Sequence, residues 1–258
     1  MLVASLQMEI NDEQSKKNRI ELAEKLLTQE KEADLLLLPE IWNTGYFNFE
    51  KYEEESESLS GPSITAISEK AAEINSYVFA GSIVEEDEGD YYNTSVMLNP
   101  EGEIIATYRK LHLFGYGSAE TEVLTPGEEV VTVDTELGTL GLSTCYDLRF
   151  PELYRKMLDQ GAEIFLITSG WPFPRVDNWK TLNKSRAAEN LSYLISCNCA
   201  GNCQGTQFLG HSMIVNPWGN TIASSAHRPT VVKAEIDLEK VEHVRNEFPS
   251  LQDRKLDQ

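Results

Sequence analysis

The chain has 258 residues, and 41% of them are apolar, which is enough for a sizeable core. With 42 acidic and 22 basic residues, the net charge of −20 argues against nucleic acid or an anionic membrane surface as partner. No run of residues is long and apolar enough for a membrane span, and the opening residues lack the basic region of a secretory signal. Four cysteines in so long a chain predict no disulfide framework. We therefore expect a cytoplasmic protein with one domain over residues 1–258, in which the sequons at Asn93, Asn183 and Asn190 are accidental.

The first half of the chain alternates between patterns typical of strands and of helices. Apolar positions at helical spacing occur within residues 20–27 and 64–74. The expected strands cover residues 3–8, 35–38, 77–84, 94–98 and 104–108. The last two of these strands flank Asn99-Pro100-Glu101-Gly102, whose turn chemistry predicts a hairpin.

The second half repeats this order. After a strand that ends near Thr144, the expected strands and helices cover residues 151–158, 163–168, 179–190, 193–198, 211–223 and 231–236. The duplication predicts an α/β fold in which two sheets pack face to face, with helices outside each. Residues 239–258 are rich in charge and are predicted to form a C-terminal arm, suited to crossing the partner in a homodimer.

Glu40 follows the buried strand 35–38 directly, because Pro39 ends that strand. The carboxyl ends of strands are the usual location of functional groups in α/β sheets. Most glutamates are solvated, which is the alternative interpretation of Glu40. Its aromatic neighbours favour a partly enclosed pocket, although such residues also build plain core: Trp42, Tyr46, Phe47 and Phe49.

Lys110 lies at the end of the second hairpin strand, ahead of a loop of the kind that commonly lines sites. This loop contains Glu120 and Glu122. A surface charge is the ordinary interpretation of a single lysine, and a structural role is the ordinary one for His112.

Cys145 lies between an apolar strand and a helix that begins near Pro151. A helix N-terminus favours negative charge and can lower the pKa of a thiol, as a nucleophile requires. A small apolar core residue is the competing interpretation.

These three strand ends together supply what acyl transfer needs. Cys145 would be the nucleophile, Glu40 the base that takes and returns its proton, and Lys110 the cation beside the developing oxyanion. The backbone N–H of Tyr146 is a second candidate for the oxyanion site.

The three motifs resemble, in order and spacing, the signature segments of the nitrilase superfamily of carbon–nitrogen hydrolases. They read LLLLPE with Glu40, YRKLHLF with Lys110 and STCYDLRFPEL with Cys145, and SRAAEN and GHSMIVNPWG add to the resemblance. The resemblance implies a four-layer α-β-β-α sandwich, a Glu-Lys-Cys catalytic set, no metal and no organic cofactor. It also implies a supporting second glutamate, for which Glu120 is in register and Glu122 is the alternative.

Within the superfamily, CYDLRFP resembles the amidase branches, and the segment from Ser169 to Trp179 resembles amidases of 2-oxo acid ω-amides such as 2-oxoglutaramate. Such a substrate carries a carboxylate, which Arg175 or Arg149 would receive. Each arginine could instead be a structural salt-bridge partner, and we favour that role for Arg149. Trp171 and Phe173 either wall the pocket or belong to the core.

Three alternatives remain open at this stage. An N-carbamoyl compound could replace the amide as substrate. Cys197, Cys199, Cys203 and His211 could hold a structural zinc in a non-enzymatic interaction protein, although the usual C-x2-C knuckles are missing. A papain-like hydrolase would need His112 or His211 as its base.

Overall fold

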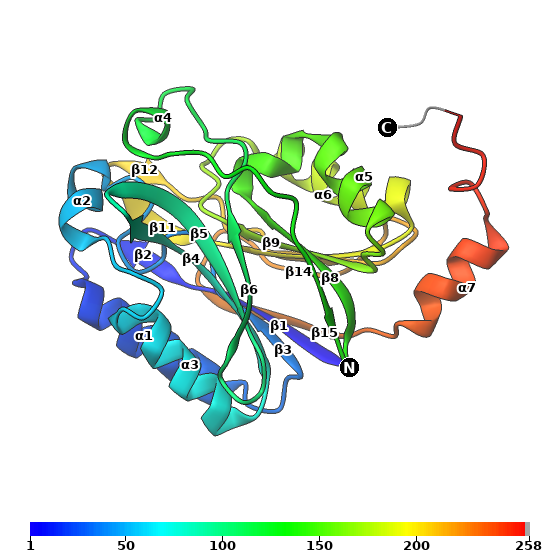
Figure 1. Ribbon diagram of the computed structural model, residues 1–258, viewed down its shortest axis with the longest axis horizontal. Coiled ribbons are helices and arrows are strands. Elements are labelled where there is room, and N and C mark those ends of the chain that lie inside the picture. The colour runs from blue at the N-terminus through cyan, green and yellow to red at the C-terminus, as the bar shows by residue number, and fades with distance from the viewer. Residues whose placement is uncertain (256–258) are drawn as a thin grey trace.

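Two six-stranded sheets lie face to face in the centre of the molecule, and helices cover the outer face of each (Figure 1). The computed structural model describes residues 1–255. The predicted four-layer α-β-β-α sandwich is confirmed.

The first sheet runs in the order β15-β1-β3-β4-β5-β6. Its strands are β1 (Leu2–Gln7), β3 (Leu35–Leu37), β4 (Tyr77–Asp87), β5 (Asp90–Leu98), β6 (Ile104–Arg109) and β15 (Thr230–Glu235). The three strands β1, β3 and β4 are parallel, and the other pairings are antiparallel. Helices α1 (Lys16–Gln29) and α3 (Pro62–Ile74) cover its outer face (Figure 1).

The second sheet has the order β14-β13-β10-β9-β8-β7. Its strands are β7 (Thr132–Thr135), β8 (Gly138–Thr144), β9 (Ile164–Ser169), β10 (Tyr193–Asn198), β13 (Met213–Val215) and β14 (Thr221–Ser224). Helices α5 (Pro151–Asp159) and α6 (Val176–Asn190) cover the side that faces away from the first sheet (Figure 1). The predicted duplication of strand–helix order therefore corresponds to two similar halves.

The four leucines from Leu35 to Leu38, which form β3 and the residue after it, pack against both neighbouring layers. Leu35 and Leu37 belong to the core between the two sheets, while Leu36 and Leu38 belong to the core beneath α1 and α3. All four are fully buried, and burial of one leucine side chain contributes roughly 1.5–3 kcal/mol. The strand must be apolar on both faces, as its sequence predicts.

A third, small sheet is absent from the prediction. It joins β2 (Glu9–Asn11), β11 (Ala200–Cys203) and β12 (Thr206–Gln207), with β2 parallel to β11. Segments of two to four residues are too short to show a period, and this pairing joins distant parts of the chain. The acidic run after Phe49 forms the short helices η1 (Phe49–Lys51) and α2 (Tyr52–Glu55).

The predicted C-terminal arm begins as a helix that is anchored to the body. Helix α7 (Glu239–Glu247) buries Val241 and Val244 completely, and Val241 joins the core between the sheets. The chain then continues along the outside (Figure 1), and Arg254 pairs with Asp159 at 2.6 Å. The end of the predicted arm, residues 256–258, lies outside the described residues. The segment is therefore partly core, since both of its valines are buried and Val241 packs between the two sheets.

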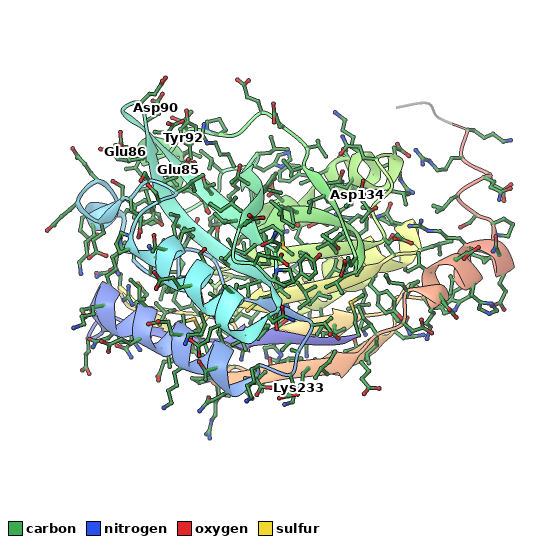
Figure 2. All side chains as sticks on the ribbon, turned by 60° about the horizontal axis from the view of Figure 1, so that its bottom comes forward. Glu85, Glu86, Asp90, Tyr92, Asp134 and Lys233 are labelled. Carbon is green, nitrogen blue, oxygen red and sulfur yellow. The ribbon has the colours of Figure 1, made fainter. Side chains whose placement is uncertain are left out.

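Polar side chains cover the outside of the sandwich, and Glu86 and Asp90 point away from the body at the tip of the β4–β5 hairpin (Figure 2). The three sequon asparagines are all fully buried, so their side chains are inaccessible to glycosylation in the folded protein. Within residues 1–255, no helix is long and apolar enough to cross a membrane.

Candidate active site

The three predicted strand ends meet in one buried cluster. Glu40 follows β3, Lys110 follows β6 and Cys145 follows β8, so both sheets contribute to it. The side chains of Glu40 and Lys110 are fully enclosed, and Cys145 keeps 6% of its surface accessible. Of the three side chains, only the thiol reaches the surface of the cluster.

Lys110 is held between two carboxylates. Its Nζ lies 2.8 Å from Oε1 of Glu40 and 2.8 and 3.0 Å from the two oxygens of Glu120. Burial disfavours the charged lysine, but the negative charges of Glu120 and Glu40 outweigh burial and raise its pKa well above the usual value. Lys110 is therefore a fixed cation at neutral pH.

Glu120 is the buried acceptor of several donors, whereas Glu122 is exposed. Helix α4 (Glu120–Val123) begins at Glu120 and turns its side chain inward. Its Oε2 accepts hydrogen bonds from the Tyr46 hydroxyl at 3.0 Å and from the Phe114 N–H at 2.6 Å, in addition to that from Lys110. Of the two predicted candidates for a supporting glutamate, the structure brings Glu120 into the cluster and leaves Glu122 outside.

Glu40 has a different set of partners on its two oxygens. Oε1 accepts from Lys110 and from the Asn93 amide, both at 2.8 Å, while Oε2 accepts from the backbone N–H of Gly170 at 2.7 Å. Burial raises the pKa of Glu40, and the positive charge of Lys110 only partly opposes this increase. A carboxylate with a raised pKa is a suitable proton acceptor and donor near neutral pH.

Cys145 occupies a strained turn. Its φ of 48° lies in the left-handed region, which non-glycine residues seldom adopt, and it begins the 3-10 helix η2 (Cys145–Arg149). Such a turn presents a nucleophile above the end of a strand. The first N–H groups of a helix have no partner within it, so the Tyr146 N–H is suited to an oxyanion.

The prediction of a lowered thiol pKa is wrong for this resting state. Burial raises the pKa of Cys145 well above its usual value, the negative charge of Glu40 raises it further, and Lys110 opposes both effects. The short helix cannot offset an enclosed site beside a carboxylate. To act as a nucleophile this thiol would need a base, and Glu40 is the carboxylate whose charge acts most strongly on it.

The backbone around Glu40 depends on close contacts. Gly81 in β4 has a φ of +67°, and a Cβ there would lie 2.1 Å from the carbonyl oxygen of Pro39. The next residue, Ser82, donates its N–H to that same oxygen at 3.2 Å. Only glycine lets β4 approach closely enough to hold the turn before Glu40.

Asp147 connects the Cys145 turn to the segment of Lys110. Its carboxylate accepts from the Thr144 N–H at 2.9 Å, the Tyr108 hydroxyl at 2.7 Å and the His112 N–H at 3.1 Å. Tyr108 and His112 lie two residues before and after Lys110, so one buried carboxylate aligns two of the three motifs.

A small pocket opens above the thiol. It is lined by Tyr46, Phe114, Cys145, Tyr146, Arg149, Gly170, Trp171, Pro172 and Arg175. The guanidinium of Arg149 lies 4.9 Å from the Trp171 ring centre, and that of Arg175 lies about 6 Å from the rings of Phe114 and Tyr116. Within residues 1–255 neither arginine forms an ion pair.

Comparison with known proteins supports the same family. The family model for carbon–nitrogen hydrolases matches residues 2–246. The chain belongs to the carbon–nitrogen hydrolase family. It is an enzyme that cleaves carbon–nitrogen bonds in amides.

Two curated relatives are bacterial. The 2-oxoglutaramate amidase of Paenarthrobacter nicotinovorans is 36% identical over 99% of this chain and 90% of its own length. The 2-oxoglutaramate amidase of Bacillus subtilis is 35% identical over 99% of this chain and 98% of its own length.

A solved structure gives the same fold. Nit3 of Saccharomyces cerevisiae, described as a member of the nitrilase superfamily, superposes with a TM-score of 0.87 at 30% identity, covering 96% of this chain and 94% of its own. The expected nitrilase-superfamily resemblance is confirmed.

The pocket of this hydrolase differs in several respects from the sequence-based predictions. Arg149 was expected to be a structural salt-bridge partner, but it stacks on Trp171 and lines the pocket. Phe173 was expected to share a role with Trp171, but it is half exposed and does not line the pocket. Of the four aromatic neighbours of Glu40 between Trp42 and Phe49, only Tyr46 lines the pocket, whereas Trp42 is buried core.

The zinc alternative is not supported by the positions of its residues. In the described part of the chain, no three or more His, Cys, Asp or Glu side chains are placed to hold a metal ion. The thiols of Cys197 and Cys199 instead donate to the carbonyls of Leu6 and Glu40, at 3.3 and 3.6 Å. Cys199 thus packs against the backbone of Glu40.

The papain-like alternative lacks a histidine at the thiol. His112 Nδ1 lies 2.8 Å from Asp147, and its ring stacks on Phe150 with centres 3.7 Å apart. His211 does not line the pocket either. Glu40 is therefore the better candidate for the base.

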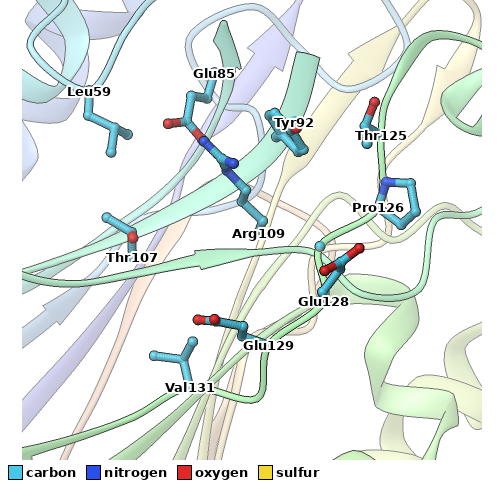
Figure 3. A pocket seen from close by; sticks show the side chains of 11 residues that line it. Leu59, Glu85, Tyr92, Thr107, Arg109, Thr125, Pro126, Glu128, Glu129 and Val131 are labelled. Carbon is cyan, nitrogen blue, oxygen red and sulfur yellow. The ribbon is translucent and has the colours of Figure 1, made fainter. Parts of the chain in front are cut away.

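A larger pocket, of about 530 Å³, lies elsewhere and contains none of the three motif residues (Figure 3). Arg109 lines this pocket, and its guanidinium lies 3.8 Å from the Tyr92 ring centre. The same guanidinium forms ion pairs with Glu85 and Asp87. Arg109 is the only cation in the lining of this pocket and is already paired with two carboxylates, so the pocket attracts an anion only weakly.

Two members of the cluster, Tyr46 and Asn93, are not predicted from the sequence. Tyr46 was noted only as an aromatic neighbour, although its hydroxyl binds Glu120. Asn93 was noted only as a sequon, although its amide binds both Glu40 and Glu120. For Asn93, the available signal is a polar residue at a buried position of the strand β5.

Proposed function

We propose that this enzyme hydrolyses the ω-amide of a small 2-oxo acid, such as 2-oxoglutaramate, to the acid and ammonia. The observation that carries the proposal is the pocket above Cys145, which holds two guanidinium groups that form no ion pair with any residue from 1 to 255. The names of the two bacterial relatives support the same substrate class.

Arg149 and Arg175 are proposed to receive the substrate carboxylate. A protein of net charge −20 repels an anion at long range, so a local cation must supply the attraction. Guanidinium groups bind carboxylates through two parallel hydrogen bonds. With the carboxylate at the arginines and the amide at Cys145, the length of the substrate is selected between these groups.

The first half of the proposed reaction forms a thioester. Glu40 takes the proton of the Cys145 thiol, and the sulfur attacks the amide carbon. The negative charge that develops on the carbonyl oxygen is held by Lys110 and the Tyr146 N–H. When the tetrahedral intermediate collapses, Glu40 returns the proton to the leaving nitrogen and ammonia departs.

The second half releases the acid. Glu40, again a carboxylate, takes a proton from water as the water oxygen attacks the thioester carbon. The same donors stabilise the second tetrahedral intermediate, and the Cys145 thiolate leaves and regains the proton from Glu40. Glu120 acts by keeping Lys110 charged and in place, without exchanging protons itself.

Residues 1–258 are proposed to be a single hydrolase domain that forms a cytoplasmic homodimer. Pairing of β15 with β1 joins both ends of the chain in one sheet, which supports a single unit. Four cysteines without disulfide bonds suit a reducing compartment. The rings of the exposed residues Trp218 and Phe248 have their centres 5.9 Å apart and would provide an apolar contact for a second copy.

The test is ammonia release from a panel of compounds: 2-oxoglutaramate, glutamine, propionamide, an N-carbamoyl amino acid and a nitrile. We expect the highest kcat/KM with 2-oxoglutaramate. A higher value with the carbamoyl compound would favour the alternative substrate class, and a higher value with the nitrile would overturn the assignment to amidases.

A further inference from the structure

Asn93 lies beneath the catalytic cluster and contacts both of its carboxylates. Its amide Nδ2 donates to Oε1 of Glu40 at 2.8 Å and to Oε1 of Glu120 at 3.0 Å. Its backbone carbonyl oxygen accepts from the backbone N–H of Lys110 at 2.9 Å. The residue sits in β5, is fully buried and does not line the substrate pocket.

We propose that Asn93 is a positioning residue that assigns different roles to the two glutamates, so that Oε2 of Glu40 becomes the only atom of the pair that exchanges protons. The inference rests on the proposed roles of Glu40 and Cys145.

The assignment follows from the number of donors at each oxygen. A carboxylate oxygen has about two lone-pair sites, so an oxygen that accepts two hydrogen bonds has no site left for a proton. At Glu120, Oε1 accepts from Lys110 and Asn93, and Oε2 accepts from Tyr46, Phe114 and Lys110. Both oxygens of Glu120 are therefore fully occupied by donors.

At Glu40 the count leaves one position free. Oε1 accepts from both Lys110 and Asn93, whereas Oε2 accepts, among the residues that the structure describes, only from the Gly170 N–H. Because Gly170 is part of the pocket wall, Oε2 lies on the side of the reacting groups. The two hydrogen bonds at Oε1 thus direct the proton to the atom that can use it.

The other polar atom of Asn93 indicates that stability alone does not account for this residue. Its Oδ1 is buried and has no hydrogen-bond partner among the described residues. An unpaired buried acceptor has a desolvation cost, which folding would avoid if an apolar residue served equally well. The two carboxylate contacts of Nδ2 explain why an asparagine is retained there.

The proposal predicts a change in the ionisation of the Glu40–Cys145 pair. A donor to the charged form of a carboxylate lowers its pKa, so loss of the Asn93 amide shifts the ionisation of the pair to higher pH. The titratable groups that face Glu40 are Lys110, Glu120, Tyr46, Tyr52, Cys145 and Cys199. Both variants below retain all of them, and Asn93→Asp adds a further carboxylate, so Asn93→Ser is the variant that tests loss of the donor alone.

The experiment compares Asn93→Asp and Asn93→Ser with the parent enzyme. Alkylation of Cys145 by iodoacetamide is followed by intact mass from pH 5 to pH 10, and kcat and KM are measured with the best amide. Both variants are expected to move the acid limb of alkylation and of kcat upward by about one pH unit or more. The expected kcat at pH 7 is at least tenfold lower, with KM changed less than threefold.

Asn43→Ser is the matched control. Asn43 is also fully buried, and its amide donates to the carboxylate of Glu57 at 2.8 Å, outside the cluster. This variant should lose stability without a shift of either acid limb. A folded Asn93→Ser protein with the parent pH profile would overturn the proposal, as would an equal shift in the control.

The alkylation measurement does not depend on the substrate. If the parent released ammonia from no amide in the panel but the alkylation limb still moved in the Asn93 variants, the substrate assignment would be wrong and the role of Asn93 would stand.

Discussion

The hydroxyl of Tyr108 donates a 2.7 Å hydrogen bond to Oδ2 of Asp147, and this bond joins the strand before Lys110 to the turn of Cys145. Tyr108 lies in β6 of the first sheet and Asp147 in η2, which follows β8 of the second sheet, so the bond links the two halves of the sandwich. It fixes the distance between the proposed nucleophile and the proposed oxyanion cation more directly than sheet packing does.

Tyr108→Phe should therefore affect activity beyond its effect on stability. We expect a loss of about 1–2 kcal/mol in unfolding free energy, since one hydrogen bond to a buried carboxylate is removed. The expected kcat is about tenfold lower at unchanged KM. Tyr154→Phe is the control, because its buried hydroxyl contacts Ser143 at 3.0 Å and does not reach the Lys110 segment. Equal kcat values in the two variants would argue against the linking role.

Cys145→Ala should abolish turnover while the fold is kept. Removal of a nucleophile from a preorganised site reduces kcat by at least about a thousandfold. The measurement is ammonia release together with thermal unfolding. Cys197→Ala is the control for loss of a buried thiol, because Cys197 donates to the carbonyl of Leu6, away from the cluster, and the variant should keep the parent kcat. Substantial turnover by Cys145→Ala would exclude the thioester mechanism.

Glu120→Gln should reduce kcat by roughly a hundredfold, because an amide nitrogen would face donors where a carboxylate oxygen now accepts them. Glu122→Gln serves as the control, since that side chain is exposed two residues away. KM should change little in both variants. Parent-like turnover by Glu120→Gln would show that Lys110 does not need its second carboxylate.

Arg149→Gln and Arg175→Gln should raise KM for 2-oxoglutaramate by roughly 10- to 100-fold, the loss expected for one charge-assisted hydrogen bond. KM for propionamide, which has no carboxylate, should stay the same and is the internal control. An arginine whose loss changed both substrates equally would be supporting the pocket wall instead of binding the anion.

The pH dependence of activity follows from the raised pKa of Glu40. Glu40 must be unprotonated to accept the thiol proton, so the acid limb of kcat/KM should lie above the ordinary glutamate pKa of about 4.3. The same raised pKa affects the stability of the fold in the opposite direction, because protonation of Glu40 favours the folded state. Its contribution to stability is fully present below the ordinary pKa and is lost as pH rises through the raised one.

Activity should consequently decline on mild acidification, whereas protonation of Glu40 over the same pH range should favour the folded state. The check is a kcat/KM profile beside circular dichroism over the same pH range. Coincident loss of activity and of ellipticity would show that unfolding, and not protonation of Glu40, sets the acid limb.

Much of the site was predictable because buried strands have a simple pattern. Leu35 to Leu38 are apolar on consecutive positions, and Pro39 marks where they stop, so the place of Glu40 at a strand end follows from the sequence. The same reasoning placed Lys110 and Cys145. Their convergence at one point required the superfamily resemblance, since a strand order of two separate sheets cannot be read from periodicity.

Other features depend on contacts between distant segments. Asn93 lies within a strand, and no local pattern shows that its amide meets two glutamates from other elements. The pairing of β2 with β11 involves too few residues to leave a signal. For Cys145, the local helix favoured a lowered thiol pKa, but burial and the charge of Glu40 come from the tertiary structure and have the larger effect.

The pairing of β1 with β15 also has a consequence for folding. β1 occupies an interior position of its sheet, between β3 and β15, and β15 comes from residues 230–235. During synthesis, one edge of β1 therefore stays unpaired until nearly the whole chain has been made. Unpaired strand edges on incomplete chains are prone to aggregation. We expect ribosome-bound chains that stop before β15 to need chaperone protection, although every motif of the active site has already been translated.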